Sequence, residues 1–194
     1  MTETILGLLR HGQTDWNVEG RLQGTSDIAL NATGLAQAQA AAEAIDPGEW
    51  DILLSSPLSR AHQTAARIAQ LHGLHDVTVD QRFLERAFGE AEGLSYEQWK
   101  ILHDPAIGVA GGESLEQLEV RANRLLSEIS IEYAGNRVLA VSHGALIRKL
   151  VRIASKKTLP REGERFANTS LTKLVHNDGE WSILHYDGHS LAGF

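Results

Sequence analysis

The feature that constrains this chain most is a pair of short apolar runs, each ending in a histidine followed by a glycine. Residues 5–9 lead into Arg10-His11-Gly12, and residues 138–141 lead into Ser142-His143-Gly144. Apolar runs of this length, bounded by polar residues, are typical of buried strands. In open α/β sheets, ligands bind at the carboxyl ends of the strands. If these two strands are parallel neighbours, two histidines and an arginine face one pocket, which suits an anion and above all a phosphate.

The remaining sequence alternates between strand and helix patterns. Short runs predict a second buried strand at residues 52–54 and a third short strand at 77–79. Apolar residues at helical spacing predict helices over residues 31–45, from Pro57 to about 71, and over 114–133 and 145–153, with N-caps at Asn31, Ser56 and Ser114. The buried faces of the first three helices are expected to include Leu35, Ala38, Ala42 and Ile45; Ala61, Ala65, Ile68 and Leu71; and Leu118, Ala122, Leu125 and Ile129.

Three segments depart from this alternation. Residues 16–29 are polar and aperiodic, which predicts a loop, and residues 83–112 are rich in glycine, which indicates an inserted lid with one short helix at about 96–102. Apolar and polar residues alternate within residues 169–175 and within 181–185. The turn sequence Asn177-Asp178-Gly179 lies between the two segments, which indicates an antiparallel hairpin. We therefore predict an α/β fold with a mostly parallel sheet flanked by helices and an antiparallel edge hairpin. The 194 residues suit one domain, 1–194.

Composition narrows the classes of partner and site. The chain has 18 Lys and Arg against 25 Asp and Glu, a formal net charge of −7, which argues against a nucleic-acid partner. An anionic substrate must then be held by a local cluster of arginine and histidine. The absence of cysteine excludes disulfides, thiolate metal sites and a cysteine nucleophile. No segment reaches the ~20 apolar residues of a membrane span, and no signal peptide is evident, so we expect a cytoplasmic protein without a membrane partner.

Five ordered blocks in the first three quarters of the chain resemble the histidine phosphatase superfamily, which includes the cofactor-dependent phosphoglycerate mutases. The matching residues are Arg10-His11-Gly12 with Trp16-Asn17 and Arg21-Leu22-Gln23-Gly24; residues 55–61 with Thr64; Glu85 ahead of Phe88-Gly89; residues 111–114; and Ser142-His143-Gly144. The resemblance implies a three-layer sandwich.

The resemblance also implies roles for the residues at these positions. His11 is the residue that is phosphorylated, and a neutral imidazole with an ordinary pKa of ~6.5 is a competent nucleophile at pH 7. Arg10 and Arg60 bind phosphoryl oxygens, and His143 is expected to become a third cation beside the phosphate dianion. Glu85 is the general acid, which protonates the leaving alkoxide and then deprotonates the attacking water. The remaining substrate-binding residues are Asn17, Gln23, Gly24 and Gly144.

Structural alternatives remain for each of these residues. His11 and His143 could be core histidines or half of a metal site, although a metal cation beside Arg10 and Arg60 is electrostatically unfavourable. We therefore expect no metal and no cofactor.

Two further segments carry alternatives of their own. Glu90 and Glu92 lie in the same loop as Glu85; most loop glutamates are only solvated, and Glu90 is the alternative acid. The basic segment from Lys156 to Arg165 is expected to be a solvated loop, or alternatively to contact the tail of a substrate.

The function predicted from these residues is that of a histidine acid-type phosphatase. It is a metal-independent phosphomonoester hydrolase that acts on a small phosphorylated metabolite, and a homodimer is a possible assembly. A phosphoglycerate mutase is the alternative, because it uses the same residues. A mutase must also hold a second phosphate, yet the only Lys or Arg between Arg86 and Ser114 is Lys100, among several acidic residues.

Two sequence departures from the family bear on the substrate. Ala91 stands where phosphatase members often carry Trp, and Ala87-Phe88 stands where mutases carry His-Tyr. A third hypothesis, an inactive phosphate-binding protein, is disfavoured because all the chemical positions are filled.

Overall fold

The fold is built around a six-stranded sheet in the order β3-β2-β4-β1-β6-β7. The structure is a computed structural model and describes residues 3–73, 77–102 and 109–190. Strands β1 to β4 run parallel to one another, and β6 and β7 are antiparallel, which confirms the predicted parallel sheet with an edge hairpin. The strands are β1 (Thr4–Arg10), β2 (Ile52–Ser55), β3 (Thr78–Val79), β4 (Arg137–Ser142), β6 (Leu171–Asn177) and β7 (Glu180–His185).

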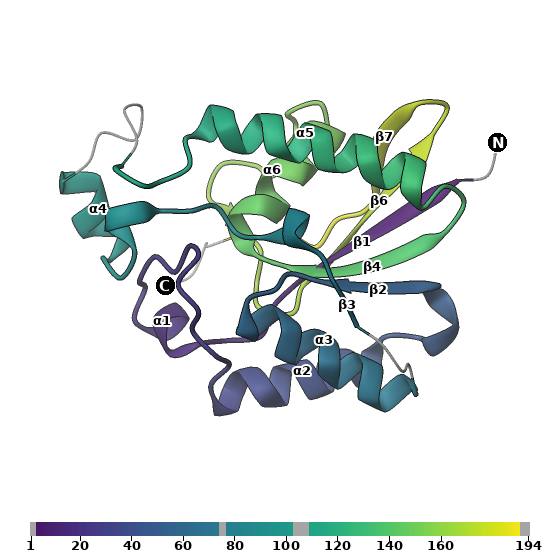
Figure 1. The fold of residues 1–194 in the computed structure, drawn as a ribbon, viewed down its shortest axis with the longest axis horizontal. Coiled ribbons are helices and arrows are strands. Elements are labelled where there is room, and N and C mark those ends of the chain that lie inside the picture. Colours follow the sequence, from purple (N-terminus) through teal and green to yellow (C-terminus); the bar gives the residue numbers. More distant parts are fainter. Residues whose placement is uncertain (1–2, 74–76, 103–108, 191–194) are drawn as a thin grey trace.

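Helices cover both faces of this sheet and bury its side chains on both sides (Figure 1). The helices α2 (Ala32–Ala44) and α3 (Ser59–His72) lie on one face, and α5 (Leu115–Glu132) and α6 (Gly144–Ala154) lie on the other. Leu9 of β1 packs with the α2–α3 layer, whereas Leu6 and Leu8 pack with the α5–α6 layer. Because successive strand residues point to opposite faces, a short apolar run can serve two cores at once.

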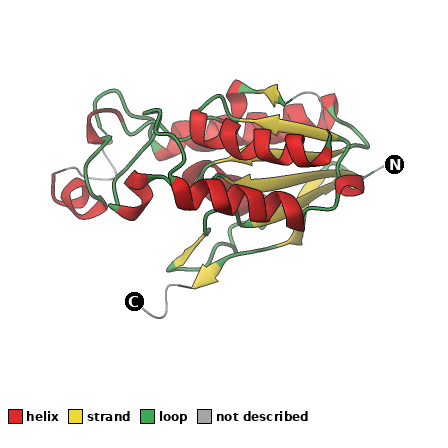
Figure 2. Ribbon diagram, turned by 90° about the horizontal axis from the view of Figure 1, so that it is seen from below, coloured by secondary structure: helices red, strands yellow, loops and turns green. Residues whose placement is uncertain are grey.

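The shorter elements gather at the end of the sheet where β1 finishes, opposite the amino terminus (Figure 1). They include α1 (Asp15–Val18), α4 (Tyr96–Leu102) and the 3₁₀ turns Gln81–Phe83 and Gly89–Ala91; a further 3₁₀ turn, Pro47–Glu49, connects α2 to β2. The strands β5 (Glu164–Arg165) and β8 (His189–Ser190) form a separate antiparallel pair, seen in Figure 2 beneath the main layers. Within the described ranges, no helix is both long enough and apolar enough to span a bilayer.

Two predictions about helix starts were wrong. Residues 16–29 are not all loop, because Thr14 and Asn17 form a capping box that starts α1. Ser56 does not cap α3, which begins at Ser59 and has no capping side chain on its N-cap residue, Leu58. Instead, Asp27 from the preceding loop accepts hydrogen bonds from the backbone N–H and the hydroxyl of Ser59, both at 2.7 Å.

Two leucines that were expected to be buried are exposed. Leu35 is 53% exposed and Leu71 is 47% exposed, although Ala38, Ala61 and their helix-face partners are buried. Leu35 lies in the first turn of α2 and Leu71 lies in the last turn of α3. Helical spacing identifies the buried stripe of a helix, but it does not show how far along the helix the neighbouring layer extends.

Candidate active site

The two histidines are brought together by the pairing of β1 with β4. These strands are parallel neighbours, and their register places Arg10 opposite Ser142. His11 and His143 follow directly, and their ring centroids lie 5.1 Å apart in a buried position. The expected pocket with two histidines and Arg10 therefore forms at the carboxyl ends of two central strands.

His11 is held as a neutral imidazole with one free nitrogen. Its Nδ1 lies 2.7 Å from the carbonyl oxygen of Gly12, which can only accept, so Nδ1 carries the proton and donates it. Burial lowers the pKa of His11 well below its usual value, and the charges of Arg10 and Arg60 lower it further. Nε2 is therefore unprotonated and has a lone pair available for attack on phosphorus.

Arg60 lies in the first turn of α3 and is only 1% exposed. Its Nη1 donates to the carbonyl of Ser26 at 2.8 Å, and its Nη2 donates to the carbonyl of Gly24 at 2.7 Å. Burial lowers the pKa of Arg60 to about 10. Each terminal nitrogen uses one N–H in these contacts and keeps a second N–H for a ligand.

Gly24 supports Arg60 through its backbone. It has a φ of +52°, and a Cβ at this position would lie 2.1 Å from Oε1 of Glu92. Only glycine therefore fits where its carbonyl accepts from Arg60. Gly24 thus helps to orient Arg60 through its backbone carbonyl, and its direct contact with a substrate stays a prediction.

His143 is also held as a neutral imidazole. Nε of Arg60 donates to Nδ1 of His143 at 3.2 Å, so Nδ1 is unprotonated and Nε2 donates to the hydroxyl of Ser56 at 2.7 Å. Burial lowers the pKa of His143 well below its usual value, with further contributions from Arg60 and His11. His143 is thus a neutral imidazole with an arginine beside it, and a cationic His143 beside a phosphate dianion stays a prediction.

Arg10 carries the clearest sign of an anion-binding pocket. Its Nη1 donates to the carbonyl of Phe166 at 2.5 Å, but its Nε is buried without a hydrogen-bond partner among the described residues. A buried donor left unpaired costs about 1–3 kcal/mol. A Cβ on Gly144, the first residue of α6, would lie 3.7 Å from this nitrogen, so no side chain crowds it. A phosphoryl oxygen placed there would satisfy Arg10 beside the amino terminus of a helix.

Glu85 lies at the start of the same helix. Its Oε2 accepts from the backbone N–H of Ala145 at 3.0 Å, and its Oε1 accepts from those of Leu146 at 3.0 Å and Arg86 at 2.9 Å. Its negative charge acts on both Arg10 and Arg60, which places it at the pocket. Glu90, the alternative acid, is exposed and has no contact with these arginines among the described residues. The geometry therefore favours Glu85 as the acid.

Arg121 of α5 holds the backbone that carries Glu85, and nothing in the sequence indicated this. Its guanidinium donates to the carbonyl oxygens of Arg82 at 3.3 Å, Leu84 at 2.9 Å and Glu85 at 3.4 Å. It is fixed in turn by a bidentate pair with Glu113, with distances of 2.7 and 2.8 Å. One side chain therefore ties the acid's segment to α5.

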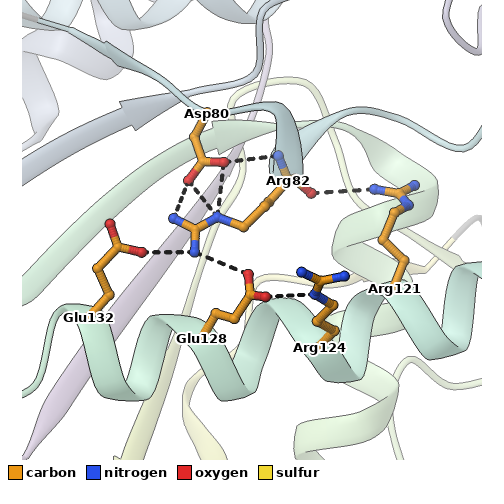
Figure 3. A network of polar contacts seen from close by, with 6 residues as sticks. All are labelled: Asp80, Arg82, Arg121, Arg124, Glu128 and Glu132. Atoms are coloured by element: carbon orange, nitrogen blue, oxygen red, sulfur yellow. Dashed lines mark hydrogen bonds and ion pairs between the residues drawn. The ribbon is translucent and has the colours of Figure 1, made fainter.

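The same segment is fastened a second time through Arg82 (Figure 3). Arg82 pairs with Asp80 at 2.6 Å and with two glutamates of α5, Glu128 at 3.3 Å and Glu132 at 2.8 Å. These ion pairs join the segment after β3, which leads to Glu85, to helix α5. The segment is therefore held to α5 by both Arg82 and Arg121.

Two carboxamides that were predicted to bind the substrate are oriented by the loop after β1. Asn17 accepts from the backbone N–H of Thr14 at 3.1 Å and from Nδ2 of Asn168 at 3.3 Å. Gln23 accepts from the hydroxyl of Thr14 at 2.9 Å. With their oxygens occupied, both side chains keep NH₂ groups that have no acceptor among the described residues and can donate to a ligand. Asn168, which no motif indicated, also donates to the carbonyl of His11 at 2.9 Å.

Glu92 is a third residue whose role the sequence did not indicate. It is not a solvated loop glutamate, because it accepts from the backbone and hydroxyl groups of Thr25 and Ser26 and from the backbone N–H of Phe88. Burial alone would raise the pKa of Glu92, but the hydrogen bonds from Ser26, Thr25 and Phe88 outweigh it and lower the pKa. Glu92 therefore clamps the loop whose carbonyls hold Arg60.

Comparison with known proteins settles the class of this site. A model of the histidine phosphatase superfamily (branch 1) matches residues 6–188. The chain belongs to this superfamily.

Relatives of this histidine phosphatase cover almost all of its length. An uncharacterized phosphatase of Bacillus subtilis, PhoE, is 36% identical over 192 residues, which are 98% of each chain. The metal-independent phosphoserine phosphatase of Arabidopsis thaliana is 32% identical over 193 residues, covering 93% of this chain and 79% of that protein. The structure of a mycobacterial glucosyl-3-phosphoglycerate phosphatase in complex with VO₃ superposes with a TM-score of 0.78 at 31% identity, covering 94% of this chain and 98% of the other.

These similarities confirm the family, the fold and the enzyme class predicted from the sequence, a phosphatase of a family that works through phosphohistidine. In the described part of the chain, no three His, Asp or Glu side chains lie close enough together to hold a metal ion.

Proposed function

We propose that this histidine phosphatase hydrolyses phosphate monoesters of small metabolites through a phosphohistidine on His11. The observation that carries the proposal is the pairing of a neutral His11, with Nε2 unprotonated, and an Arg10 whose buried Nε has no partner among the described residues. A phosphate group satisfies Arg10 and places its phosphorus beside the nucleophile.

The phosphate is bound by donors that converge from four segments of the chain. Arg10 and the free N–H groups of Arg60 neutralise the phosphoryl oxygens, and the carboxamides of Asn17 and Gln23 donate to them. The backbone N–H of Gly144, at the first turn of α6, supplies a further donor. The overall charge of −7 makes this local cluster the sole source of attraction for an anion.

In the first step, Nε2 of His11 attacks phosphorus, the N–P bond forms, and the P–O bond to the leaving alcohol breaks. Glu85, when protonated, gives its proton to the departing alkoxide. In the second step, Glu85 takes a proton from a water that attacks the phosphohistidine, and the N–P bond breaks. Inorganic phosphate leaves and His11 regains its neutral form.

A neutral His143 has a positioning role in this scheme. It accepts from Nε of Arg60 and donates to Ser56, so it orients the arginine that faces the phosphate.

The mutase alternative is disfavoured by the charges of the lid. Its one lysine, Lys100, pairs with Glu97 at 3.6 Å and lies over the ring of Tyr96. Arg86, at the start of the lid, has its Nε on the carbonyl of Glu113 at 2.8 Å, and no other lysine or arginine of the described part of the lid is free to hold a second phosphate. The cytoplasmic location and the homodimer remain predictions.

The test begins with chromogenic and alkyl phosphate monoesters in excess chelator. Wild-type enzyme should release phosphate, and His11→Ala should lose more than ~10³-fold in kcat because the covalent route disappears. Quenched wild type should hold an acid-labile, base-stable phosphate that His11→Ala lacks. Near-normal turnover by the variant, or an acid-stable phosphoenzyme, would overturn the proposal.

The same preparation distinguishes phosphatase from mutase. With 3-phosphoglycerate and its bisphosphate primer, free phosphate should appear faster than 2-phosphoglycerate. Isomer that forms much faster than free phosphate would show the mutase instead.

A further inference from the structure

The segment from Phe166 to Ser170 lies against the two residues that begin the phosphate pocket. The carbonyl oxygen of Phe166 accepts from Nη1 of Arg10 at 2.5 Å, and Nδ2 of Asn168 donates to the carbonyl of His11 at 2.9 Å. The carbonyl of Ser170 accepts from the backbone N–H of Arg10 at 3.1 Å. Every second residue of this segment therefore contacts Arg10 or His11.

The side chains of Arg10 and Ser170 lie on the same face of the sheet. Leu9 of β1 packs with the α2–α3 layer, so Arg10, the next residue, points to the α5–α6 face. Leu171 of β6 also packs with the α2–α3 layer, so Ser170, the residue before it, points to the α5–α6 face as well. Opposite residues on one face of an antiparallel pair have Cβ atoms about 4.5–5.5 Å apart, which makes the Ser170 hydroxyl a neighbour of the guanidinium.

A bulge and a tight turn fix the backbone of Ser170. Thr169 and Ser170 both lie opposite Arg10, because the N–H of Thr169 donates to the carbonyl of Arg10 at 3.0 Å. The N–H of Ser170 donates to the carbonyl of Ala167 at 3.2 Å, and Thr169 in this turn has a φ of +60°. A positive φ is strained for a β-branched residue, and such strain concentrates at functional sites. The turn therefore points to a function for the residue that it positions.

Two buried polar atoms on this shared face have no partner among the described residues. They are Nε of Arg10 and the hydroxyl oxygen of Ser170, a residue that is only 6% exposed. The two atoms are not bonded to each other, and both groups can donate. A single oxygen with several lone pairs, placed between them, completes both. A phosphoryl oxygen fits this place, because a Cβ on Gly144 at the start of α6 would lie 3.7 Å from the same Nε.

We propose that Ser170 is a phosphate-binding residue whose hydroxyl donates to the phosphoryl oxygen that also accepts from Nε of Arg10. This inference rests on the proposed phosphatase function. The oxygen concerned stays on phosphorus through both steps, so the hydroxyl stabilises bound substrate, phosphohistidine and inorganic phosphate alike. Ser170 transfers no proton to the leaving group, and its contribution is therefore the same for good and poor leaving groups.

Ser170→Ala tests this role, because it removes the hydroxyl and leaves the rest of the side chain. The Kd of inorganic phosphate, measured by calorimetry, should rise by about tenfold to a hundredfold, as expected for one hydrogen bond to a charged group. The value of kcat/KM should fall by a similar factor, equally for an alkyl phosphate and for p-nitrophenyl phosphate. The Tm of the ligand-free variant should equal or exceed that of wild type, because an unpaired buried hydroxyl is gone.

The matched control is Thr172→Val, which removes a buried hydroxyl two residues further along the same face of the strand. Thr172 lies opposite Leu8, and its hydroxyl accepts from the backbone N–H of Asp187 at 3.4 Å. This variant should keep the wild-type Kd for phosphate and the wild-type kcat/KM.

An unchanged Kd in Ser170→Ala would overturn the inference but leave the phosphatase function intact. A lower Tm of ligand-free Ser170→Ala would also overturn it, because the hydroxyl would then support the fold or a permanently bound water. Absence of any His11-dependent hydrolysis in wild type would overturn the phosphatase proposal and, with it, the role of Ser170 in that reaction.

Discussion

Nε of Arg60 donates a hydrogen bond to Nδ1 of His143 over 3.2 Å, and this contact adds to burial in keeping the second histidine of the pocket neutral. An arginine that donates to an imidazole nitrogen requires a lone pair there, so the ring's one proton lies on Nε2, where Ser56 accepts it. His11 is neutral mainly because burial lowers its pKa, with further lowering by Arg10 and Arg60; the hydrogen bond from its Nδ1 to the carbonyl of Gly12 fixes the tautomer. Two buried imidazoles thus face a phosphate pocket whose positive charge comes from arginines.

This relationship predicts how stability depends on pH. The folded-state pKa values of His11 and His143 are both lowered, mainly by burial, from the ordinary value of 6.5. Below pH 6.5 the unfolded chain binds more protons than the folded protein, so stability is complete above that pH and is lost as the pH falls. Each histidine should contribute a slope of up to about 1.4 kcal/mol per pH unit.

Urea unfolding between pH 5 and pH 8 measures this slope. His11→Ala should be less sensitive to acid than wild type, because one of the two contributions is gone. His62→Ala changes an exposed histidine of α3 and should keep the wild-type slope. If the slopes of wild type and His11→Ala coincide below pH 6.5, His11 is not held neutral in the folded protein.

The sequence predicted the pocket because strand order and side-chain chemistry are local signals. Apolar runs at residues 5–9 and 138–141 mark central strands, and the residues after them must lie at the same sheet edge once the strands pair in parallel. The charge of His143 was not predictable in this way. It depends on Ser56, which the sequence presented as a helix cap, and on an arginine 83 residues away in the chain.

The supporting residues were missed for a related reason. Glu92 and Arg121 act on backbone groups, and backbone groups leave no pattern in a sequence. A glutamate that accepts from five donors, four of them in another loop, has the same local sequence as a solvated one. Only the folded arrangement separates the two cases, as it does for Glu92 and the exposed Glu90.

Glu92 should prove necessary for placing Arg60. In Glu92→Gln an amide NH₂ replaces one oxygen and faces donors, so the loop carrying Gly24 and Ser26 must shift. Arg60 then loses the carbonyls that orient it, and kcat/KM should fall by up to about 10²-fold, as expected for a displacement near 1 Å.

Glu90→Gln is the matched control, because it makes the same change two residues away on an exposed side chain. It should alter stability by less than about 0.5 kcal/mol and keep wild-type kinetics. Equal kcat/KM values for the two variants would contradict the clamp.

Arg121 should be required for the acid step rather than for phosphate binding. It donates to the carbonyl oxygens of Leu84 and Glu85, so Arg121→Gln frees the segment that carries the acid. A displaced acid matters most when the leaving group is a poor one that needs a proton in the transition state. The loss in kcat should therefore be about tenfold or more for an alkyl phosphate and much smaller for p-nitrophenyl phosphate.

Arg124→Gln provides the comparison on the same helix. Arg124 is exposed and, among the described residues, pairs with Glu128 one turn away at 2.6 Å, a solvent-screened contact that contributes little to stability. Its kinetics with both substrates should match wild type. An Arg121→Gln variant that loses the same factor on both substrates would indicate that Arg121 supports the fold of the pocket and not the position of Glu85.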